Sequence, residues 1–282
     1  MARGGSLAAL AAVLGLAGCV PAAAPTRAAP LRIVSLDYCA DQFVLRFAPR
    51  AHIAGLSPDA GKPFSYMRAA AQGVPTIRPR TDDVLALRPD VVVRSYGGGP
   101  GIERALGQAR VRVIQLGFPE TLADVRSEVV RVGAALGDPK EAEVVAKAMD
   151  RRLASIPQPS GGRPRALYMT AGGVTAGPGT LVHELFEAAG LDNFQDRPGW
   201  NPIPLERLAY SRPDLIAAAS FAGAGGNIDS WSAARHPLAL APLRAGPQVG
   251  IEGAWTSCGG WFLVDAVEAL ARHRAAMEST GR

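Results

Sequence analysis

Two cysteines carry the most distinctive chemistry in this sequence. Cys39 follows a short apolar run, and Cys258 lies in the segment Trp-Thr-Ser-Cys-Gly-Gly-Trp near the carboxyl terminus. A disulfide between them would require Cα atoms within about 7 Å and an oxidising compartment. Thiolate ligation of a soft metal is a second interpretation, although two sulfurs without a histidine partner form an incomplete site. Two separate buried thiols are the third interpretation, and the sequence leaves all three open.

The other reactive residue types show no pattern typical of catalysis or of a resident cofactor. Ser35 and Ser257 do not lie in a Gly-x-Ser-x-Gly motif. The glycine-rich stretch 170–180 lacks the Gly-Lys-Ser/Thr that ends a phosphate-binding loop. We therefore expect a protein that is not an enzyme, with no intrinsic cofactor and no assigned metal site. The four histidines, which lack metal-binding spacing, are His52, His183, His236 and His273.

The charge of the chain is modest and scattered. It has 30 Lys and Arg against 25 Asp and Glu, a formal net charge of +5. No basic run with interleaved aromatic residues indicates nucleic acid binding. After the amino-terminal segment, no stretch approaches the roughly twenty apolar residues that cross a bilayer. With few cysteines the fold must rest on an ordinary hydrophobic core, and we expect a monomer that binds no nucleic acid.

The amino terminus predicts export. Arg3 precedes the apolar run 7–16, which is too short to span a membrane, and Leu-Ala-Gly-Cys then ends at Cys19. This tetrapeptide looks like a bacterial lipobox, so we expect a signal peptide over 1–18, lipidation of Cys19 and an unstructured tether over 19–30. The alternative is an ordinary secretory signal cut nearby, for example after Ala24. The location is then the periplasm, either anchored to the membrane as a lipoprotein or soluble.

Short apolar runs alternate with helical segments through residues 31–119. Such alternation is typical of a parallel sheet with helices on its faces, and it predicts a first α/β lobe. The expected strands are 31–36, 52–56, 74–77, 90–94 and 111–116, and the expected helices are 40–47, 83–88 and 102–108.

Residues 120–156 have apolar positions at every third or fourth residue, which predicts long connecting helices. Asp138 as an N-cap and Pro139 at the first helical position predict that a second helix begins there. Placed end to end, the two helices would span roughly 50 Å and form a rigid strut between the lobes. The alternation resumes in a second lobe over 163–276. The fold class is therefore α/β: two Rossmann-like lobes with central, mostly parallel sheets joined by a long helical backbone. In the second lobe we expect strands at 165–170, 214–218 and 249–251, and helices at 181–189, 204–210 and 261–275.

A weak internal repeat supports two lobes. Residues 82–92 parallel residues 206–216, each with an acidic residue seven positions before a Pro-Asp that opens an apolar strand. Chance recurrence of a common connection is the alternative, so the repeat favours duplication only modestly.

Four segments carry a resemblance to a known family that extends from residue 31 to about 275. They are LRIVSLDYCADQFVL, TDDVLALRPDVVV, TLVHELFEAAGLDNF and WNPIPLERLAYSRPDLI. In order and spacing they resemble the helical-backbone class of ABC-transporter substrate-binding proteins, which carry ferric siderophores, haem and cobalamin. The resemblance implies a ligand cleft between the lobes, little hinge motion, and delivery to an ABC permease with its ATPase. In that family an acidic residue on each lobe pairs with permease arginines; the matching positions are Glu206 and Asp82, where Asp replaces the usual Glu.

Ligand residues are expected where strands end, because open α/β sheets bind ligands at the carboxyl ends of their strands. Trp200 also matches a position where cobalamin binders of the resembled family carry a ligand-contacting tryptophan. Core packing is the alternative, and it is favoured for Phe118 and Phe221. The candidate cleft residues are Asp37, Tyr38, Cys39, Phe64, Tyr66, Tyr96, Gly97, Gly98, Gly172, Trp200, Trp255, Cys258 and Trp261.

Aromatic residues in a cleft suit a flat, largely apolar macrocycle or a catecholate. With the resemblance, they imply a small metal chelate containing cobalt or iron, with cobalamin or another corrinoid first and a ferric siderophore second. Haem is an alternative, since Tyr38, Tyr66 or Tyr96 could be an axial ligand. An extracytoplasmic hydrolase is less favoured.

Overall fold

A computed structural model describes residue 1, residues 31–220 and residues 232–280. The chain divides into residues 1–30 and a compact unit of residues 31–282, which contains both lobes. The expected signal peptide, Cys19 and the tether lie outside the described residues, as does Phe221. Within the described residues, no helix is both long and apolar enough to span a bilayer.

The first lobe is built on a four-stranded parallel sheet in the order β2-β1-β3-β4. Its strands read as apolar runs because helices and loops cover both faces of a parallel sheet. One face packs on α1 and the other on α2 and α3, so the lobe has a core on each side. The elements are β1 (Ile33–Ser35), α1 (Tyr38–Phe47), β2 (Ile53–Gly55), α2 (Thr81–Ala86), β3 (Val91–Arg94), α3 (Ile102–Gln108) and β4 (Arg112–Gln115). The strand expected at 74–77 is wrong, since only a single bridge between Leu56 and Thr76 forms there.

The second lobe has a parallel sheet in the order β10-β9-β5-β7. Helices α6 and α10 cover one face, and α7 and α8 cover the other. An antiparallel pair, β6 with β8, adds a small second sheet that the sequence did not predict. The elements are β5 (Arg165–Thr170), β6 (Val174–Ala176), α6 (Leu181–Ala188), β7 (Asp192–Asn193), β8 (Trp200–Pro202), α7 (Leu205–Tyr210), β9 (Leu215–Ser220), α8 (Pro237–Ala245), β10 (Gln248–Glu252), α9 (Gly253–Thr256) and α10 (Leu263–Ser279). The expected α/β class with two parallel sheets is confirmed.

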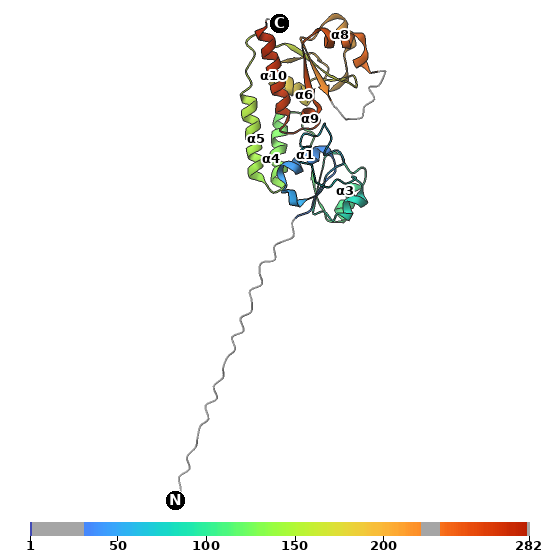
Figure 1. Cartoon of the computed structure of the whole chain (residues 1–282), viewed down its shortest axis with the longest axis vertical. Coiled ribbons are helices and arrows are strands. Elements are labelled where there is room, and N and C mark those ends of the chain that lie inside the picture. Colours follow the sequence, from blue (N-terminus) through green and yellow to red (C-terminus); the bar gives the residue numbers. More distant parts are fainter. Residues whose placement is uncertain (2–30, 221–231, 281–282) are drawn as a thin grey trace. The chain divides into compact units, whose positions relative to one another are not determined.

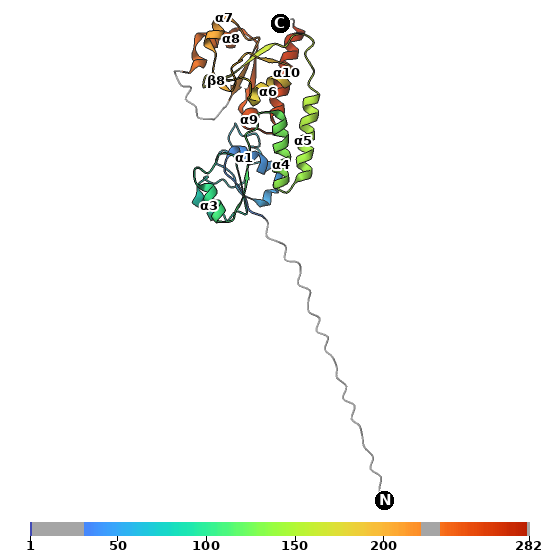
Figure 2. The same ribbon diagram turned by 180° about the vertical axis from the view of Figure 1, so that it is seen from behind.

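The connecting helices α4 (Leu122–Ala135) and α5 (Pro139–Ala154) pack side by side (Figures 1 and 2). The end-to-end strut is therefore wrong. Gly137 has φ of +100°, which lets the chain reverse, and Asp138 then caps α5. Val125 of α4 belongs to the core of the second lobe, whereas Val129 and Val132 belong to that of the first. One helix thus contributes to both cores.

The internal repeat has a structural counterpart. Asp90 and Asp214 stand at the same place before β3 and β9. Each carboxylate accepts a hydrogen bond from the backbone N–H of an arginine at the start of the first strand of its lobe: Arg32, just before β1, at 2.7 Å and Arg165, the first residue of β5, at 2.8 Å. The same contact in both lobes favours duplication more strongly than the sequence pattern does.

The terminal helix is fixed by a buried cation. Arg274 of α10 is 1% exposed, and its Nε donates to the carbonyl oxygen of Ala189 at 2.9 Å. The guanidinium also donates to the carbonyl of Pro157 and to the Glu278 carboxylate. Replacing Arg274 would leave the carbonyl of buried Ala189 without its donor and the Glu278 carboxylate without its cation, and losing the donor to a buried group costs about 1–3 kcal/mol.

We expect Arg274→Met to lower the free energy of unfolding by about 3 kcal/mol, because methionine fills part of the volume but donates no hydrogen bond. Urea denaturation followed by circular dichroism measures the change. Arg151→Met, at an exposed position of α5, is the matched control and should change stability by less than about 0.5 kcal/mol. Equal stability of the two variants would contradict the assigned role of Arg274.

Candidate ligand cavity between the lobes

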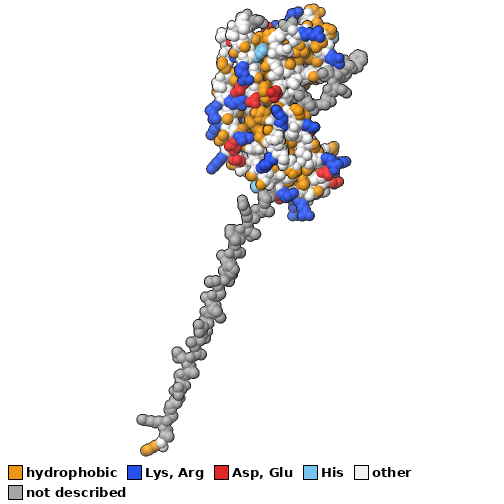
Figure 3. Space-filling view, in the orientation of Figure 1, with side chains coloured by type: hydrophobic (Ala, Val, Ile, Leu, Met, Phe, Trp, Pro, Cys, Tyr) orange, Lys and Arg blue, Asp and Glu red, His pale blue; other side chains and the backbone are white. Residues whose placement is uncertain are grey.

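A cavity of about 530 Å³ lies between the two lobes. The described surface is hollowed between the lobes in Figure 3. Its walls come from the carboxyl ends of strands in the first lobe, from α4, and from the start of α6 and the segment after α9 in the second lobe. The polar and aromatic lining residues include Tyr38, Ser95, Tyr96, Phe118, Glu120, Glu128, Thr180, Trp200, Thr256 and Ser257. No Lys, Arg or His is among the described residues that line it.

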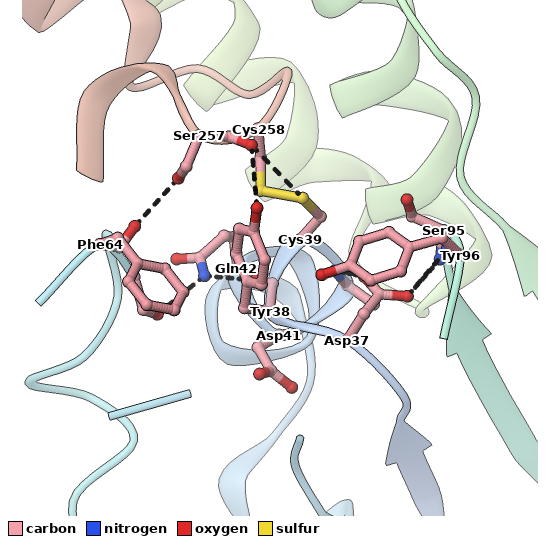
Figure 4. The surroundings of a disulfide bond; sticks show 12 residues. Asp37, Tyr38, Cys39, Asp41, Gln42, Phe64, Ser95, Tyr96, Ser257 and Cys258 are labelled. Carbon is pink, nitrogen blue, oxygen red and sulfur yellow. Dashed lines mark hydrogen bonds between the residues drawn. A yellow bond between two sulfur atoms is a disulfide. The ribbon is translucent and has the colours of Figure 1, made fainter. Parts of the chain in front are cut away.

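Cys39 and Cys258 form a disulfide that lines this cavity (Figure 4). Their Cα atoms are 5.5 Å apart, within the range for such a bond. Cys39 stands in the first turn of α1 in the first lobe, and Cys258 follows α9 in the second. The bond therefore joins the lobes covalently. Of the three interpretations left open by the sequence, separate thiols and thiolate ligation of a metal are wrong in this structure, because the sulfurs are bonded to each other.

Tyr38 occupies the centre of an aromatic cluster beside the disulfide (Figure 4). Its ring lies edge-on to Phe64 at 5.0 Å and to Tyr96 at 6.0 Å between centroids. The Tyr38 hydroxyl donates to the carbonyl oxygen of Ser257 at 3.5 Å, and the Ser257 hydroxyl donates to the carbonyl of Phe64 at 2.9 Å. The first-lobe wall and the second-lobe loop thus hold each other in place.

Burial raises the pKa of Tyr38 although a hydrogen bond from Tyr96 opposes the shift. The pKa of Tyr96 is also raised, first by desolvation and then by the nearby Tyr38. Both side chains are therefore neutral phenols at pH 7. They offer the cavity hydroxyl groups rather than negative charge.

Asp37 positions this wall rather than lining it. The buried Asp37 carboxylate accepts from Ala40 N at 2.9 Å and so caps α1. Its other oxygen accepts from the backbone N–H groups of Ser95 at 2.7 Å and Gly97 at 3.0 Å. A Cβ on Gly97 would lie 2.2 Å from a backbone oxygen of Leu36, so only glycine fits there. Neighbouring Gly98 has φ of +96°. Asp37, Gly97 and Gly98 therefore fix the loop that presents Tyr96.

Phe118 of the first lobe and Trp200 of the second are the most exposed aromatic residues of the cavity lining. Phe118 is 78% exposed and Trp200 is 60% exposed, and both line the cavity. The expected core packing of Phe118 is wrong, because the chain leaves β4 through an exposed Gly-Phe-Pro loop held by a 2.8 Å bond from Gly117 N to Glu128. The Trp200 ring lies 6.2 Å from that of Tyr168.

Several candidate residues lie outside this cavity. Tyr66 stacks on Phe262 at 4.6 Å and donates to the Asp265 carboxylate at 2.9 Å. Trp261 comes from the second lobe but packs into the first-lobe core, with its ring 5.7 Å from those of Phe43 and Phe47. These side chains join the lobes and are not in the cavity wall. The other candidates absent from the wall are Gly97 and Gly98, which shape the loop of Tyr96, Phe64, which contacts Tyr38, Trp255, which packs against the second-lobe core, and Gly172, which is exposed.

The sequence interpretation missed other parts of the wall. Glu120 and Glu128 bring carboxylates to it, and Thr180 at the start of α6 brings a hydroxyl. Thr180 follows a small loop rather than a predicted strand, so only its N-cap signature before an apolar helix was visible. Within the described residues, no group of three or more His, Cys, Asp or Glu side chains is arranged to hold a metal ion.

The two expected docking residues occupy matching helices. Asp82 is exposed in the first turn of α2, and Glu206 is exposed in the first turn of α7. In the described part of the chain neither forms an ion pair. Both carboxylates are thus available at the surface.

Comparison with known proteins identifies a family and a curated relative for this chain. A family model described as periplasmic binding protein matches residues 48–227. A curated cobalamin-binding protein of Halobacterium salinarum strain R1 is 27% identical over 196 residues, an alignment that covers 66% of this chain and 53% of the relative. The chain thus spans about half the length of the curated relatives it matches.

Solved structures agree in fold. The apo form of the periplasmic heme-binding protein RhuT from Roseiflexus sp. RS-1 has a TM-score of 0.69 at 19% identity, covering 87% of this chain and 100% of that one. The periplasmic vitamin B12 binding protein BtuF of Vibrio cholerae has a TM-score of 0.61 at 18% identity, covering 88% and 97%. At these identities the likeness establishes the fold alone. The family match over residues 48–227 shows that the chain belongs to the periplasmic binding protein family.

Proposed function

We propose that this protein is the solute-binding component of an ABC importer and that it holds a corrinoid of the cobalamin class between its lobes. The observation that carries the proposal is the inter-lobe cavity with the aromatic side chains of Tyr38, Tyr96, Phe118 and Trp200 in its lining. Aromatic faces suit a flat, largely apolar macrocycle. The cobalamin-binding relative supports this choice among metal chelates.

The charge of the wall also favours a corrinoid over a ferric siderophore. Glu120 and Glu128 are the described residues of the cavity lining that carry a formal charge at pH 7. Glu128 is already paired with Arg131 at 2.7 Å, and no cation lines the cavity among the described residues, so a strongly anionic ferric catecholate would gain no positive partner there. A corrinoid ring around cobalt has no such negative charge at its centre.

Haem is the second candidate, and the pair Tyr38 and Tyr96 favours it. Either hydroxyl could approach an iron from one face. Because burial raises the pKa of both phenols, iron would have to displace a proton to gain a phenolate ligand. A corrinoid requires no such step, and we rank it first.

The proposal also covers delivery of the ligand to a permease and the compartment in which the protein acts. The exposed carboxylates of Asp82 and Glu206 would contact arginines of the permease, which works with its ATPase. The protein would act in the periplasm as a monomer, held to the membrane through lipidated Cys19. It would return its ligand unchanged, as a binding protein rather than an enzyme.

We expect cyanocobalamin to bind stoichiometrically, and Trp200→Ala to weaken binding about tenfold, or about 1.4 kcal/mol, through lost contact with the ring. Isothermal titration calorimetry measures both, with hemin and a ferric hydroxamate and catecholate as competing candidates. Tyr210→Ala removes another exposed aromatic residue, one that does not line the cavity, and is the matched control.

If none of these chelates binds at micromolar concentration, the assigned substrate class is wrong. If hemin alone binds, the second candidate replaces the first. Recovery of the bound chelate by mass spectrometry after incubation tests whether the protein alters it. A changed chelate would contradict a pure binding role.

A further inference from the structure

A second open cavity, of about 560 Å³, adjoins the inter-lobe cavity on the first lobe. Tyr96 is the residue that the two linings share, so both spaces lie against its side chain. The second cavity is formed by the end of β3 and the loop that leads into α3. Its lining consists of Arg94, Tyr96, Gly99, Pro100, Gly101, Glu103 and Arg104.

Arg94 is the feature that makes this cavity distinctive. It is the last residue of β3, and it is 9% exposed. A guanidinium has five N–H donors. Arg94 forms an ion pair with Glu103, while its Nε has no hydrogen-bond partner within the described part of the chain. Within the described part of the chain only its Nη1 has a partner, so the guanidinium that lines this cavity keeps N–H donors for a further acceptor.

The charge of the second cavity is opposite to that of the first. Arg104 is exposed and forms no ion pair with any described residue. Two arginines against Glu103 leave one net positive charge on the lining. In the inter-lobe cavity the charged residues of the described lining are the carboxylates Glu120 and Glu128. A ligand that occupies both spaces therefore meets an apolar aromatic wall on one side of Tyr96 and cations on the other.

The loop between the two arginines leaves the cavity open. Gly99 and Gly101 have φ of +66° and +87°, and a Cβ at either position would meet no atom within 4 Å. No side chain from these positions fills the space, so a ligand group can approach the backbone. Tyr96 itself is 53% exposed.

We propose that this Arg94–Arg104 pocket is a second subsite that takes an anionic substituent, a phosphate or a carboxylate, of the chelate whose ring lies in the inter-lobe cavity. The inference rests on the proposed function and deepens it. Arginine pairs with both anions through charge-assisted, often bidentate hydrogen bonds. A corrinoid would supply the phosphodiester of its nucleotide loop, and haem would supply a propionate.

The test compares ligands that share a ring but differ in the anion. For corrinoids these are cyanocobalamin, cobinamide phosphate and dicyanocobinamide, which lacks the phosphate. For porphyrins they are hemin and its dimethyl ester. Calorimetry gives the affinity ratio within each series, and the series that binds identifies phosphate or carboxylate as the anion. We expect the ligands with the anion to bind about tenfold more tightly.

Protein variants assign the preference to this pocket. Arg104→Gln and Arg94→Gln should each reduce the ratio severalfold while leaving the affinity for the anion-free ligand unchanged. Glu103→Gln should increase it, because it removes the competing carboxylate. Arg151→Gln is the matched control, because Arg151 is exposed on α5 and does not line this pocket. Should Arg94→Gln fail to fold, the exposed Arg104→Gln and the Glu103→Gln variants still decide the question.

The outcomes separate the two proposals. Equal affinity for ligands with and without the anion, or a ratio unchanged by Arg104→Gln, overturns the subsite and leaves the proposed function in place. A wild-type protein that binds no member of either series overturns the proposed function, and the subsite with it.

Discussion

The Cys39→Ser, Cys258→Ser double variant is expected to have a free energy of unfolding about 5 kcal/mol lower than that of the oxidised protein. The two cysteines are separated by 219 residues. Cross-linking so long a loop restricts the unfolded chain strongly, and the chain-entropy relation gives about 5 kcal/mol at 25 °C. Native contacts around the bond remain in the variant, because Tyr38 and Ser257 still join the lobes.

Urea denaturation of the wild type with and without reductant, beside the double variant, measures this effect. The reduced wild type should unfold with the variant, and the oxidised wild type at a higher urea concentration. Peptide mapping of the oxidised protein should recover Cys39 and Cys258 in one cross-linked fragment. Free, alkylatable thiols at both positions in the oxidised protein would contradict the disulfide.

The contribution of Asp41 to the stability of the protein is expected to fall as the pH rises from about 4 to 7. This side chain is fully buried in α1 and accepts from Ser57 N at 3.0 Å and Ser57 Oγ at 2.6 Å. Burial raises its pKa to about 7, although these hydrogen bonds oppose the shift.

The direction follows from proton binding. In the unfolded chain the pKa of this carboxyl returns to about 3.9, so between pH 4 and 7 the folded state holds a proton that the unfolded state has lost. The stabilising contribution is complete below pH 4 and is lost as the pH rises through 7. A shift of about three units corresponds to about 4 kcal/mol at most.

Asp41→Asn removes the titrating group but keeps its size and most of its hydrogen bonds. The free energy of unfolding of the variant, relative to that of the wild type, should therefore rise between pH 4.5 and 7.5 and level off above pH 7.5. Urea titrations across this range measure it. Asp124→Asn is the control: the pKa of this exposed carboxyl is lowered by the bonds of its capping box, so the sign of its effect is opposite. A difference curve for Asp41→Asn that is flat with pH would contradict the prediction.

The regular elements were predictable from the sequence because their apolar patterns are strong. The Val-Val-Val of β3 and the periodic apolar residues of α4 and α5 leave little ambiguity. Helix α8 was not predicted, since Pro237 begins it and Pro242 lies within it. The pair β6 and β8 has three residues in each strand, too few to show a period.

The cavity was predictable only in part. The rule that ligands lie at the carboxyl ends of strands leads to Tyr38, Cys39 and Tyr96, which the structure does bring together. It cannot tell which lobe a side chain packs against. Trp261 follows the second-lobe sheet in sequence but is packed in the first-lobe core, and the sequence contains no signal for that exchange.

The division of α4 between the two cores has a consequence for how the molecule unfolds. Val125 fills one core and Val129 the other, one helical turn apart on the same rigid element. A lobe that separated from α4 would expose apolar surface on the helix that supports both cores. We therefore expect cooperativity to extend across the boundary between the lobes, so that the two unfold as one unit although each has its own sheet.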